Sequence, residues 1–552
     1  MNEIFSSKDL YEDAFLNETK KTLGDDIILL KGDLSGIQAF IFDVKSDGAA
    51  RELKARSAFI DILLSVVEYE INENFKANTI INTGGNFYMF IQKKDKYENC
   101  LNELIKKYEN LLAPLNLHLF ISTTEITQDK NYNSSIFELE SKLGLMKLKP
   151  WSNVTFFEPQ KTFQKYQWDL LAGKIISIMN ERGVVYFQIN RINNIENENN
   201  SSILFSNSLI KISDYKIEFN NENNNNTNNS KELVINIPKW NDKNREYCNY
   251  NNNNDVLNFE NLAHLAKIRK CDNYLCACLF DLDNMGEFLK NINSFSSFKK
   301  FSDKIKKSFQ KNISKILNKE YKDGKITRDK KDLKTYFKDN IYVVYNGGDD
   351  AFILGAWDAV LEFMKEFHNE FNNNLNHELP EKPFSFSTAM VFFKHKYPIK
   401  RIAEILETNI QEAKQSDRKI QIKLLNEKMI DIKGHWNLFG ANLKYEQYKE
   451  VVDKSKELKM FIHDENAGKV LLHRIRQTAF TYEKMIYRET FNLAFDNPEL
   501  YRISYSMRNI KNFPQELIDE FERNFMEISR KNQGYIFPFA ARFAEWKMKK
   551  KI

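Results

Sequence analysis

The sequence contains one pattern of predicted elements twice. Near the N-terminus, a buried strand and turn (IILLKGDLSGIQAFIF), a helix (RELKARSAFIDILLSVVEYEI), a Gly-Gly hairpin (TIINTGGNFYMFI) and an alternating strand (HLFISTTEI) follow one another. The second half repeats this order with YLCACLFDLDNMGEFL, NIYVVYNGGDDAFILGA and FSFSTAMVFF, followed by an amphipathic helix over YPIKRIAEILETNIQEAK. This order suits a ferredoxin-like sheet with helices on one face, so we predict an α+β chain with a duplicated domain.

The two copies match at single residues but differ in their acidic side chains. Where the second copy has Asp283, the first has Ser35. The second copy gathers carboxylates, and the first has lost most of them. The aligned positions are Asp33 with Asp281, Ser35 with Asp283, Phe40 with Phe288, Gly84 and Gly85 with Gly347 and Gly348, Asn86 and Phe87 with Asp349 and Asp350, and Ser122 and Thr123 with Ser387 and Thr388.

The remainder of the chain frames the two copies. Residues 1–24 form an N-terminal extension, residues 25–150 the first copy and residues 261–425 the second. Between them, residues 151–260 contain the Asn-rich runs FNNENNNNTNNS and YNNNND, which bury too little apolar surface to order themselves and are interpreted as surface insertions. Apolar residues at helical spacing predict a C-terminal helical domain over residues 426–552.

The composition describes a soluble globular protein of several domains. A chain of 552 residues is too long for one hydrophobic core. No apolar run approaches the length of a membrane span and MNEIFSSKDLYEDAF lacks a secretion signal, so we expect a cytoplasmic protein. The net charge of +5 permits nucleic-acid contact through local patches without arguing for it. The five cysteines form no CxxC pair, so no zinc ribbon or disulfide is expected, and Cys276 and Cys278 are expected to be buried in a strand.

The acidic residues of the second copy favour a metal site. Asp281 and Asp283 are two apart on an extended segment and can face the same side, and Asp349 and Asp350 stand at the tip of the hairpin YNGGDDAFIL. Asn-Gly-Gly-Asp is also a good turn on its own, and only its pairing with FDLDN one strand earlier favours a metal. Converging carboxylates repel one another unless cations are present, and Mg²⁺ or Mn²⁺ suits an all-oxygen site. Two such ions serve phosphoryl displacement, the chemistry of a palm-type nucleotidyltransferase or nucleotide cyclase.

Two glycines and a lysine complete this candidate site. Gly347 and Gly348 allow the turn a positive φ and let a phosphate approach the backbone. Lys414, in the amphipathic helix, is either a solvated residue or a lysine that reaches a triphosphate.

Six stretches carry a family resemblance: GDLSGIQAFIF, GAARELKARSAF, GGNFYMF, FDLDNMGEF, NGGDDAF and YPIKRIAEILETNIQEAK, which span roughly residues 25–415. With them, the chain resembles the large GGDD subunit of type III CRISPR–Cas effector complexes, which carries two palm domains. GGDD alone is a weak signal, whereas the set in this order is specific. The C-terminal region carries no motif that tests the resemblance.

The resemblance implies an enzyme that target RNA activates. Family members bind a guide RNA complex through sister subunits, and when a foreign RNA pairs with the guide, the palms convert ATP into cyclic oligoadenylates or a related messenger. Carried onto this chain, Asp281, Asp349 and Asp350 would be catalytic and hold two Mg²⁺ or Mn²⁺ ions, and the degenerate first palm would bind the acceptor nucleotide. The implied substrate-binding residues are Asp33, Ser35, Gly84 and Gly85 in the first palm and Asp283, Asn284, Gly347, Gly348, Ser387 and Lys414 in the second.

Two departures from the family bear on function. Many relatives begin with a DNA-cutting HD nuclease domain, for which the residues before the first palm are too few. The pair His463-Asp464 lacks companion histidines and is interpreted as a helix-end or surface pair, so no metal-dependent DNase is expected. The family's zinc-binding cysteine set is missing, so no zinc is expected.

Two other classes of function stay open. A stand-alone GGDEF-type cyclase would make a cyclic dinucleotide, although a degenerate palm and a large C-terminal region argue against it. A non-catalytic scaffold subunit has no use for clustered carboxylates that reduce stability. The sequence does not identify the messenger, and the acceptor is ATP or another adenosine-containing metabolite.

Overall fold

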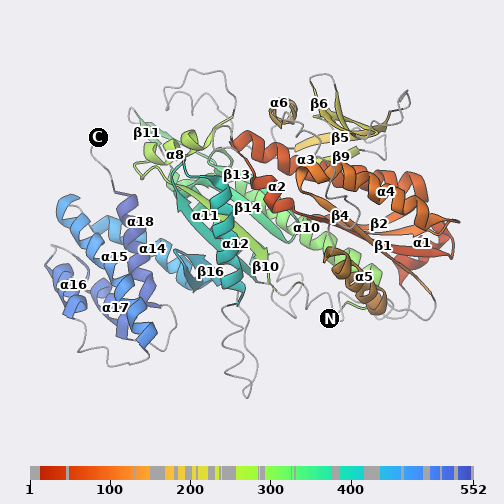
Figure 1. Cartoon of the computed structure of the whole chain (residues 1–552). Helices are drawn as coiled ribbons and strands as arrows, with labels where there is room; N and C mark the ends of the chain where they lie inside the picture. The colour runs from red at the N-terminus through yellow and green to blue at the C-terminus, as the bar shows by residue number, and fades with distance from the viewer. Residues whose placement is uncertain are drawn as a thin grey trace, which may run out of the picture.

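A computed structural model of the 552-residue chain describes most of the two palms and of the C-terminal region. The first palm, the second palm and the C-terminal helices follow one another along the molecule (Figure 1). The described residues are 13–44, 49–127, 132–148, 168–179, 184–192, 202–206, 209–221, 230–234, 238, 256–283, 285, 292–324, 326–328, 331–373, 385–415, 435–461, 465–488, 498–509, 513–526 and 533–548.

The first palm is a four-stranded antiparallel sheet in the order β2-β3-β1-β4. This is the strand order of a ferredoxin-like sheet, so the predicted fold class is confirmed. A short helix, α2, follows the first strand and leads to the long helix α3. The elements are α1 (Ala14–Leu23), β1 (Ile27–Ser35), α2 (Ile37–Phe42), α3 (Ala49–Phe75), β2 (Ala77–Thr83), β3 (Asn86–Gln92), α4 (Tyr97–Leu112), β4 (His118–Glu125) and α5 (Tyr132–Lys147).

The second palm repeats the same strand order as β13-β14-β10-β15. Its helices α10, α11 and α12 occupy the chain positions of α3, α4 and α5. Cys276 and Cys278 are fully buried in β10, as expected. The elements are α8 (Phe259–Ile268), β10 (Leu275–Leu282), α10 (Phe295–Leu317), β11 (Ile326–Arg328), β12 (Lys331–Leu333), β13 (Ile341–Asn346), β14 (Asp350–Ala356), α11 (Trp357–Phe371), β15 (Phe386–Phe393) and α12 (Ile399–Gln415).

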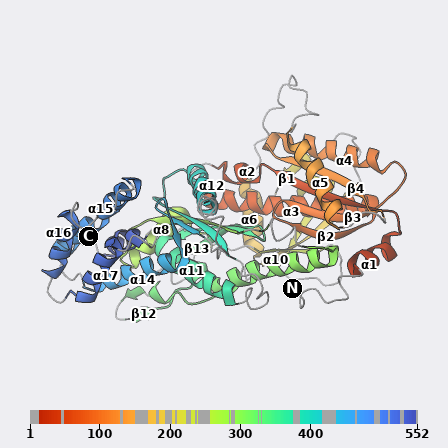
Figure 2. The ribbon, with the colours of Figure 1, turned by 90° about the horizontal axis from the view of Figure 1, so that it is seen from below.

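Helices cover both faces of each sheet, so the expectation of helices on one face was wrong. In β1, Ile28 and Leu30 pack in one core with α3 and α4, whereas Ile27 and Leu29 pack in another with α10. The apolar runs of the inner strands allow this arrangement because both faces of such strands can be buried. Figure 2 shows α10 of the second palm running beneath the first palm, next to β2.

Lysines tie each long helix to the edge strand of the opposite palm. From α3, Lys54 Nζ donates to the carbonyl oxygens of Val343 and Val344 in β13, at 3.4 Å each. From α10, Lys299 Nζ donates to the Thr79 carbonyl oxygen at 3.0 Å, and Lys306 Nζ to that of Asn82 at 3.4 Å. The edge strands β2 and β13, and with them the two hairpins, are thereby held together.

After residue 425, the first residues that the structure describes form two strands. The strands β16 (His435–Leu438) and β17 (Ala441–Lys444) extend the sheet of the second palm, and β16 runs parallel to β15. Trp436 and Leu438 are buried, and Gly440 turns the chain with φ of +86°. The short segment HWNL-FG-ANLK is therefore a hairpin. The helices that follow are α14 (Tyr445–Phe461), α15 (Glu465–Arg488), α16 (Pro498–Arg508), α17 (Gln515–Met526) and α18 (Ile536–Trp546).

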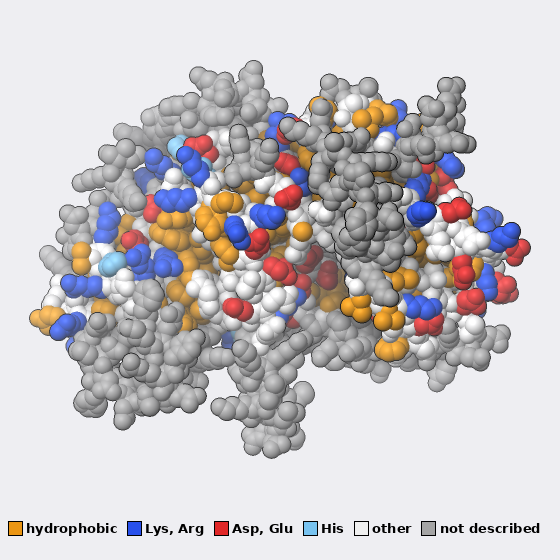
Figure 3. Space-filling model, in the orientation of Figure 1, with side chains coloured by type: hydrophobic (Ala, Val, Ile, Leu, Met, Phe, Trp, Pro, Cys, Tyr) orange, Lys and Arg blue, Asp and Glu red, His pale blue; other side chains and the backbone are white. Residues whose placement is uncertain are grey.

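The chain segment that connects the two palms forms a helix and a five-stranded sheet in the order β6-β7-β8-β5-β9. These elements lie above α3 in Figure 1. Among the described residues, no helix is both long and apolar enough to span a bilayer. Figure 3 shows Lys and Arg side chains scattered over this face among acidic and apolar ones, without one continuous basic surface. The elements of this region are α6 (Trp168–Ile178), β5 (Val184–Arg191), β6 (Ser202–Phe205), β7 (Ile210–Ser213), β8 (Tyr215–Asn220) and β9 (Ser230–Val234).

Candidate active site

The two Gly-Gly hairpins touch each other. Thr83 Oγ1 donates a hydrogen bond to the carbonyl oxygen of Gly347 at 2.9 Å. A Cβ atom on Gly84 would lie 2.7 Å from that same oxygen, which leaves no room for a side chain. Gly84 and Gly348 also have φ of +61° and +104°, a region that L side chains rarely adopt. Backbone conformation and close approach both require glycine at this contact.

Three carboxylates of the second palm gather at the end of β10. Asp281 pairs with Asp350 across the β10–β14 ladder, and the backbone N–H of Leu282 donates to the Asp349 carbonyl oxygen at 2.9 Å. Burial, and then the charges of Asp349 and Asp281, raise the pKa of Asp350 to about 8. Burial raises the pKa of Asp281 to about 6 against the opposing charge of Lys414, and it also raises the pKa of Asp349. A cation among these groups would relieve both effects.

Lys414 supplies one positive charge to this group. Its Nζ, near the end of α12, lies 2.6 Å from Oδ1 of Asp281. Asp283 is held differently, because its carboxylate accepts hydrogen bonds from Ser385 Oγ at 2.8 Å and from Ser387 Oγ at 2.6 Å. Ser387, expected to bind substrate, thus has its hydroxyl engaged by Asp283. Asp283 and Ser387 form a pair of their own beside the three clustered carboxylates.

The first palm contains a lysine–aspartate pair like that of the second. Lys147 Nζ lies 2.8 Å from Oδ1 of Asp33, which also accepts a hydrogen bond from Ser35 Oγ at 3.0 Å. Lys147 ends α5, the helix after β4, just as Lys414 lies at the end of α12, the helix after β15. Lys147 was not among the predicted site residues. The sequence signal for it is its position at the end of the helix that follows the alternating strand.

The predicted alignment of the hairpins is wrong in detail. Asn86 pairs with Asp33 as Asp350 pairs with Asp281, so Asn86 is the counterpart of Asp350 and not of Asp349. The reason is that the second turn is longer, which an alignment on the Gly-Gly pairs does not reveal. By the same register, Phe87 corresponds to Ala351, and Phe120 rather than Ser122 corresponds to Ser387.

The donor chemistry of the second palm fits a hard divalent cation. Carboxylate oxygens are preferred ligands of Mg²⁺ and Mn²⁺. Burial raises the pKa of all three aspartates, and neighbouring carboxylates raise the pKa of Asp281 and Asp350 further. The described residues contain no group of three or more His, Cys, Asp or Glu side chains arranged to hold a metal. In the present arrangement Lys414 stands against Asp281. The two-ion site stays a prediction.

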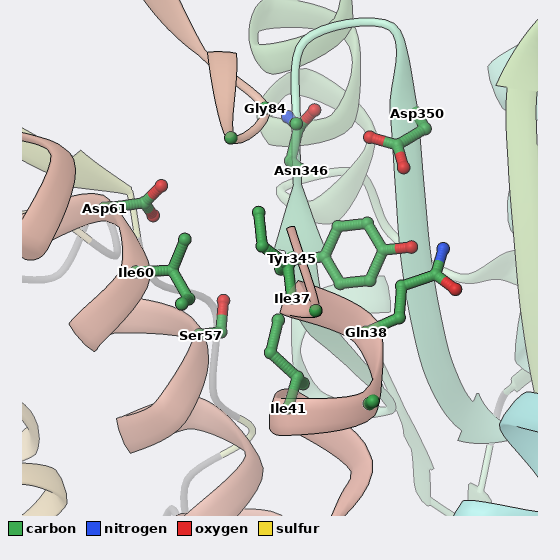
Figure 4. A pocket seen from close by; sticks show the side chains of 14 residues that line it. Ile37, Gln38, Ile41, Ser57, Ile60, Asp61, Gly84, Tyr345, Asn346 and Asp350 are labelled. Carbon is green, nitrogen blue, oxygen red and sulfur yellow. The ribbon is translucent and has the colours of Figure 1, made fainter. Parts of the chain in front are cut away.

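A cavity of about 370 Å³ opens beside the hairpins, with walls from both palms. Helices α2 and α3 of the first palm form one wall, and the end of β13 with Asp350 forms the other (Figure 4). Its volume is within the range of small-molecule sites. The sequence predicted Gly84, Gly85, Gly347 and Asp350 of this lining as site residues but not Ser57, Asp61 or Tyr345. Ser57 and Tyr345 stand in quoted stretches whose pattern predicts a helix and a strand, and nothing in that pattern shows that they face a cavity.

Some predicted residues lie outside the part of the chain that the structure describes. They are Asn284, expected to bind substrate, Phe288, aligned with Phe40, the pair His463-Asp464, and most of the two Asn-rich runs.

Two protein-family models match the chain. The model of the Cas10/Cmr2 second palm domain matches residues 274–423, and the model of Csm1 subunit domain B matches residues 26–162. Together they span more than half of the chain, and the first contains Asp281, the Gly-Gly-Asp-Asp hairpin and Lys414. The chain belongs to the Cas10 family.

Curated Cas10 proteins match at low identity. A protein of Methanocaldococcus jannaschii is 24% identical over 469 residues, which cover 70% of this chain and 56% of the relative. A protein of Streptococcus thermophilus is 21% identical over 555 residues, covering 93% of this chain and 65% of the relative. Both are named CRISPR system single-strand-specific deoxyribonuclease Cas10/Csm1 of subtype III-A. The chain spans little more than half of the length of the first of these Cas10 relatives.

Solved Cas10-family structures share the fold. A Csm1–Csm4 cassette in complex with AMPPNP gives a TM-score of 0.66 at 19% identity, covering 95% of this chain and 70% of that chain. A Csm1–Csm4 cassette in complex with cA3 gives 0.64 at 18% identity, covering 95% and 70%. At this identity the likeness establishes the double-palm fold of Cas10 and nothing about ligands.

Proposed function

We propose that this chain is the nucleotidyltransferase of a type III CRISPR effector complex. In this proposal, it converts ATP into a cyclic oligoadenylate or a related adenylate messenger when a target RNA pairs with the guide RNA. The observation that carries the proposal is the contact between the two hairpins at Thr83 and Gly347, beside a cavity with walls from both palms. Transfer between two nucleotides requires an acceptor hydroxyl held next to the donor phosphates, and a composite site supplies that geometry.

The second palm would hold the donor ATP. Asp281, Asp349 and Asp350 are the residues that would bind two Mg²⁺ or Mn²⁺ ions, which supply charge for the attacking and leaving oxygens of the displacement. Lys414 Nζ lies 2.6 Å from Oδ1 of Asp281. When ATP binds, Lys414 would leave this carboxylate and pair with the triphosphate instead. Gly347 and Gly348 would admit the phosphates to the backbone, with Asp283, Asn284 and Ser387 toward the ribose.

The first palm would hold the acceptor nucleotide. Asp33, Ser35, Gly84 and Gly85 lie at the end of β1 and at the first hairpin, on the side that meets Gly347. The Lys147–Asp33 pair repeats the Lys414–Asp281 pair and would meet the phosphates of the acceptor in the same way. This palm would supply binding without metal ligands.

Other subunits and two RNAs are the proposed partners. The solved neighbours are complexes of Csm1 with Csm4, which supports a Csm4-like sister subunit for this chain. The family resemblance implies that sister subunits carry the guide RNA, so we assign most of the contact with the guide and target RNAs to them. The activity is placed in the cytoplasm.

The test uses the complex assembled on its guide RNA. The complex is incubated with ATP and Mg²⁺, with matching target RNA or with a non-matching RNA, and the products are analysed by mass spectrometry. We expect an adenylate messenger only with matching target, and none with EDTA. Product from the isolated chain without RNA would favour a stand-alone cyclase. A folded complex that makes no product under any of these conditions would favour a scaffold subunit.

A further inference from the structure

The outer edge of the first palm sheet is open, whereas the same edge of the second palm is covered. Strand β4 ends its sheet, and among the described residues no strand pairs with its outer side. In the second palm, β16 runs parallel to the equivalent strand β15 and pairs with it at residues 388–390. By the register against Asp33 and Asp281, the equivalent segment of β4 is residues 121–123. The described part of the first palm therefore has room for one more strand at this segment.

The backbone of this segment presents hydrogen-bonding groups outward. Lys142 Nζ donates to the carbonyl oxygen of Thr123 at 2.8 Å, so this oxygen points away from β1. In an antiparallel ladder the direction alternates along the strand, so the N–H and C=O groups of Ile121 point the same way. The counterparts of Ile121 and Thr123 are Thr388 and Met390, in the stretch of β15 that pairs with β16. An edge of this kind can accept a strand from another chain.

Helix α5, which packs on β4, has apolar side chains where the equivalent helix of the second palm has charges. The two helices align on the lysine at the end of each, and their first four buried residues then coincide. On the solvent side, Phe137 and Leu145 are 75% and 68% exposed, and α12 has a glutamate at both positions. Figure 3 shows apolar side chains at the place of α5. An exposed apolar face beside an open sheet edge is typical of a protein contact. The aligned pairs are Tyr132 with Ile399, Ser135 with Ile402, Phe137 with Glu404, Leu139 with Leu406, Leu143 with Ile410, Gly144 with Gln411, Leu145 with Glu412, Met146 with Ala413 and Lys147 with Lys414.

In the second palm, this face of the helix lies next to the hairpin that covers the sheet edge. Asn442 of β17 donates a hydrogen bond from Nδ2 to the carbonyl oxygen of Glu412 at 3.3 Å. Leu145 therefore lies next to the place that such a hairpin would take in the first palm. The neighbouring positions agree, since Ala413 is 1% exposed and Met146 is 41% exposed. The edge of β4 and the exposed face of α5 thus form one surface.

Gly144, on the same face of α5, is not required by the fold. Its backbone is helical and, among the described residues, nothing lies within 4 Å of a Cβ atom built on it. A glycine inside a helix lowers the stability of that helix relative to most other residues. A glycine also lets another backbone approach closely. A strand docked on α5 would explain why a glycine stands at this position.

We propose that a sister subunit of the effector complex docks at this place through an apolar β-strand. The strand pairs with residues 121–123 of β4, parallel to them, and its side chains pack on Phe137, Gly144 and Leu145. These residues of β4 and α5 together are the α5 docking surface. The inference rests on the proposed function for the existence of sister subunits, and it adds where one of them binds.

A strand from another kind of subunit fits this surface better than a second copy of the chain. A second copy related by a two-fold axis would present its own β4, and the same strand paired across such an axis in one sheet is antiparallel. The strand at the equivalent edge of the second palm is parallel. Within the described residues, the strands of the segment between the palms pair among themselves and not with β4. The occupant is therefore a strand of a different protein.

The first test measures amide hydrogen exchange of β4. The full chain is compared free and within the complex assembled on guide RNA, by mass spectrometry of peptides that cover residues 118–125. We expect the amides of Ile121 and Thr123 to exchange about 10-fold or more slowly in the complex, because a docked strand accepts their hydrogen bonds.

The second test changes α5 toward the sequence of the second palm. The affinity of the chain for the subcomplex of guide RNA and sister subunits is measured by biolayer interferometry. Phe137→Glu combined with Leu145→Glu should weaken it on the order of 100-fold, because two apolar contacts are lost. Both positions are exposed, so the double variant should fold.

A third variant separates docking from folding. Gly144→Gln places the residue of α12 at the equivalent position of α5, where it should raise the thermal unfolding midpoint of the free chain. It should nevertheless weaken binding about 10-fold, because its side chain keeps the strand away from the helix. A chain that is more stable and binds less well excludes misfolding as the cause.

Ile405→Glu is the matched control for the double variant. Ile405 is an exposed apolar residue of α12, and α5 has Glu138 at the equivalent position. The change adds the same charge to the same kind of helix in the other palm, so the affinity for the subcomplex should stay as in wild type.

An unchanged affinity of the double variant, or unchanged exchange of β4 on assembly, would overturn the inference. A wild-type chain that dimerises by itself, with the dimer lost in the double variant, would also overturn it, since the occupant would be a second copy. Messenger synthesis by a complex that incorporates the double variant normally removes the docking surface and leaves the proposed reaction. A complex that assembles through this surface but makes no messenger keeps the surface and rejects the reaction.

Discussion

The two palms share a strand order but differ at their hairpin tips. In the first palm, Asp33 faces Asn86 across the ladder, whereas in the second, Asp281 faces Asp350. Both palms keep a lysine at the end of the following helix, paired with the strand aspartate at 2.8 and 2.6 Å. Both copies of the duplicated unit have therefore kept the sheet and the lysine. Only the second copy has the cluster of aspartates.

The turn length explains part of the difference. The paired residues that flank the turn are Thr83 and Asn86 in the first palm, but Asn346 and Ala351 in the second. The longer second turn has room for Asp349, which has no counterpart in the first palm. The first palm, with its two-residue turn, still contacts the second palm through its glycines. This suits a palm that would bind a nucleotide without metal ions.

The largest expected effect comes from removing the acids of the second palm. Asp349→Ala combined with Asp350→Ala should reduce messenger synthesis by on the order of 1,000-fold or more, because the donor phosphates lose their charge stabilisation. The product is quantified by mass spectrometry of the assembled complex.

RNA binding and thermal stability serve as controls for this double variant. RNA binding should be kept because the change removes proposed metal ligands only. Thermal stability should be kept because the half-buried carboxylates of Asp349 and Asp350 repel each other in the folded chain. Normal synthesis would remove the second palm from the catalytic site.

A matched substitution in the first palm tests whether that palm takes part in messenger synthesis. Gly85 has φ of +88° and a Cβ there would lie 2.4 Å from Ile37 Cδ1, at the wall of the cavity. Gly85→Trp should lower synthesis by about 100-fold by filling the acceptor site while every metal ligand remains.

The control for Gly85→Trp is Gly24→Trp. Gly24 has a similar φ of +93°, but nothing lies within 4 Å of a Cβ there, so it carries the same backbone strain away from the site. Comparable activity of the two folded variants would reduce the first palm to a structural remnant of the duplication.

The two lysines should differ in what they change. In the proposed site Lys414 would bind the reacting phosphates, so Lys414→Ala is expected to lower kcat. Lys147 would bind only the acceptor, so Lys147→Ala is expected to raise the KM for ATP about 10-fold. Steady-state kinetics of the activated complex separate the two parameters.

Lys142→Ala is the control for Lys147→Ala, since Lys142 lies on the same helix and pairs with Glu138 at 2.7 Å. An unchanged KM in Lys147→Ala would show that its pair with Asp33 is only structural.

The smallest effect concerns stability at the boundary of the palms. The side chain of Asp61 is exposed to solvent, yet the protein packed around it raises the pKa of Asp61 from 3.8 to about 6, so the folded chain binds this proton more tightly than the unfolded chain. The charged form then lowers the free energy of unfolding progressively as the pH rises from about 4 to about 6. Asp61→Asn should be more stable than wild type by about 1 kcal/mol at pH 8 and equal to it near pH 4. The expected difference is small because solvent in the cavity screens the charge of Asp61.

Denaturant unfolding at the two pH values measures this difference. Lys54 and Lys306 favour the charged form of Asp61 and therefore make the difference in stability between Asp61→Asn and wild type smaller. A variant that is less stable than wild type at pH 8 would show that the charged form of Asp61 does not destabilise the folded chain.

The sequence predicted the parts of the site that depend on local pattern. The Gly-Gly hairpins, the strand that ends in Asp281, and the repeat of the whole unit are all visible in alternation and turn residues. Lys147 was missed because α5 has apolar residues on both faces, with Phe137 and Leu145 exposed, so its helix has no clear amphipathic pattern. Ser57 and Asp61 reach the site only because α3 packs against β13 of the other palm, a contact between segments far apart in the chain.

The central claim is that one chain forms one catalytic site from its own two palms. The most direct test mixes two inactive chains before assembly, one with Asp349→Ala and Asp350→Ala and one with Gly85→Trp, and measures the messenger against the wild-type complex. The account predicts no product from the mixture, because each chain has one defective half of its own site. Product restored toward a quarter or more of the wild-type amount would contradict it, since the working palms would then have met between chains.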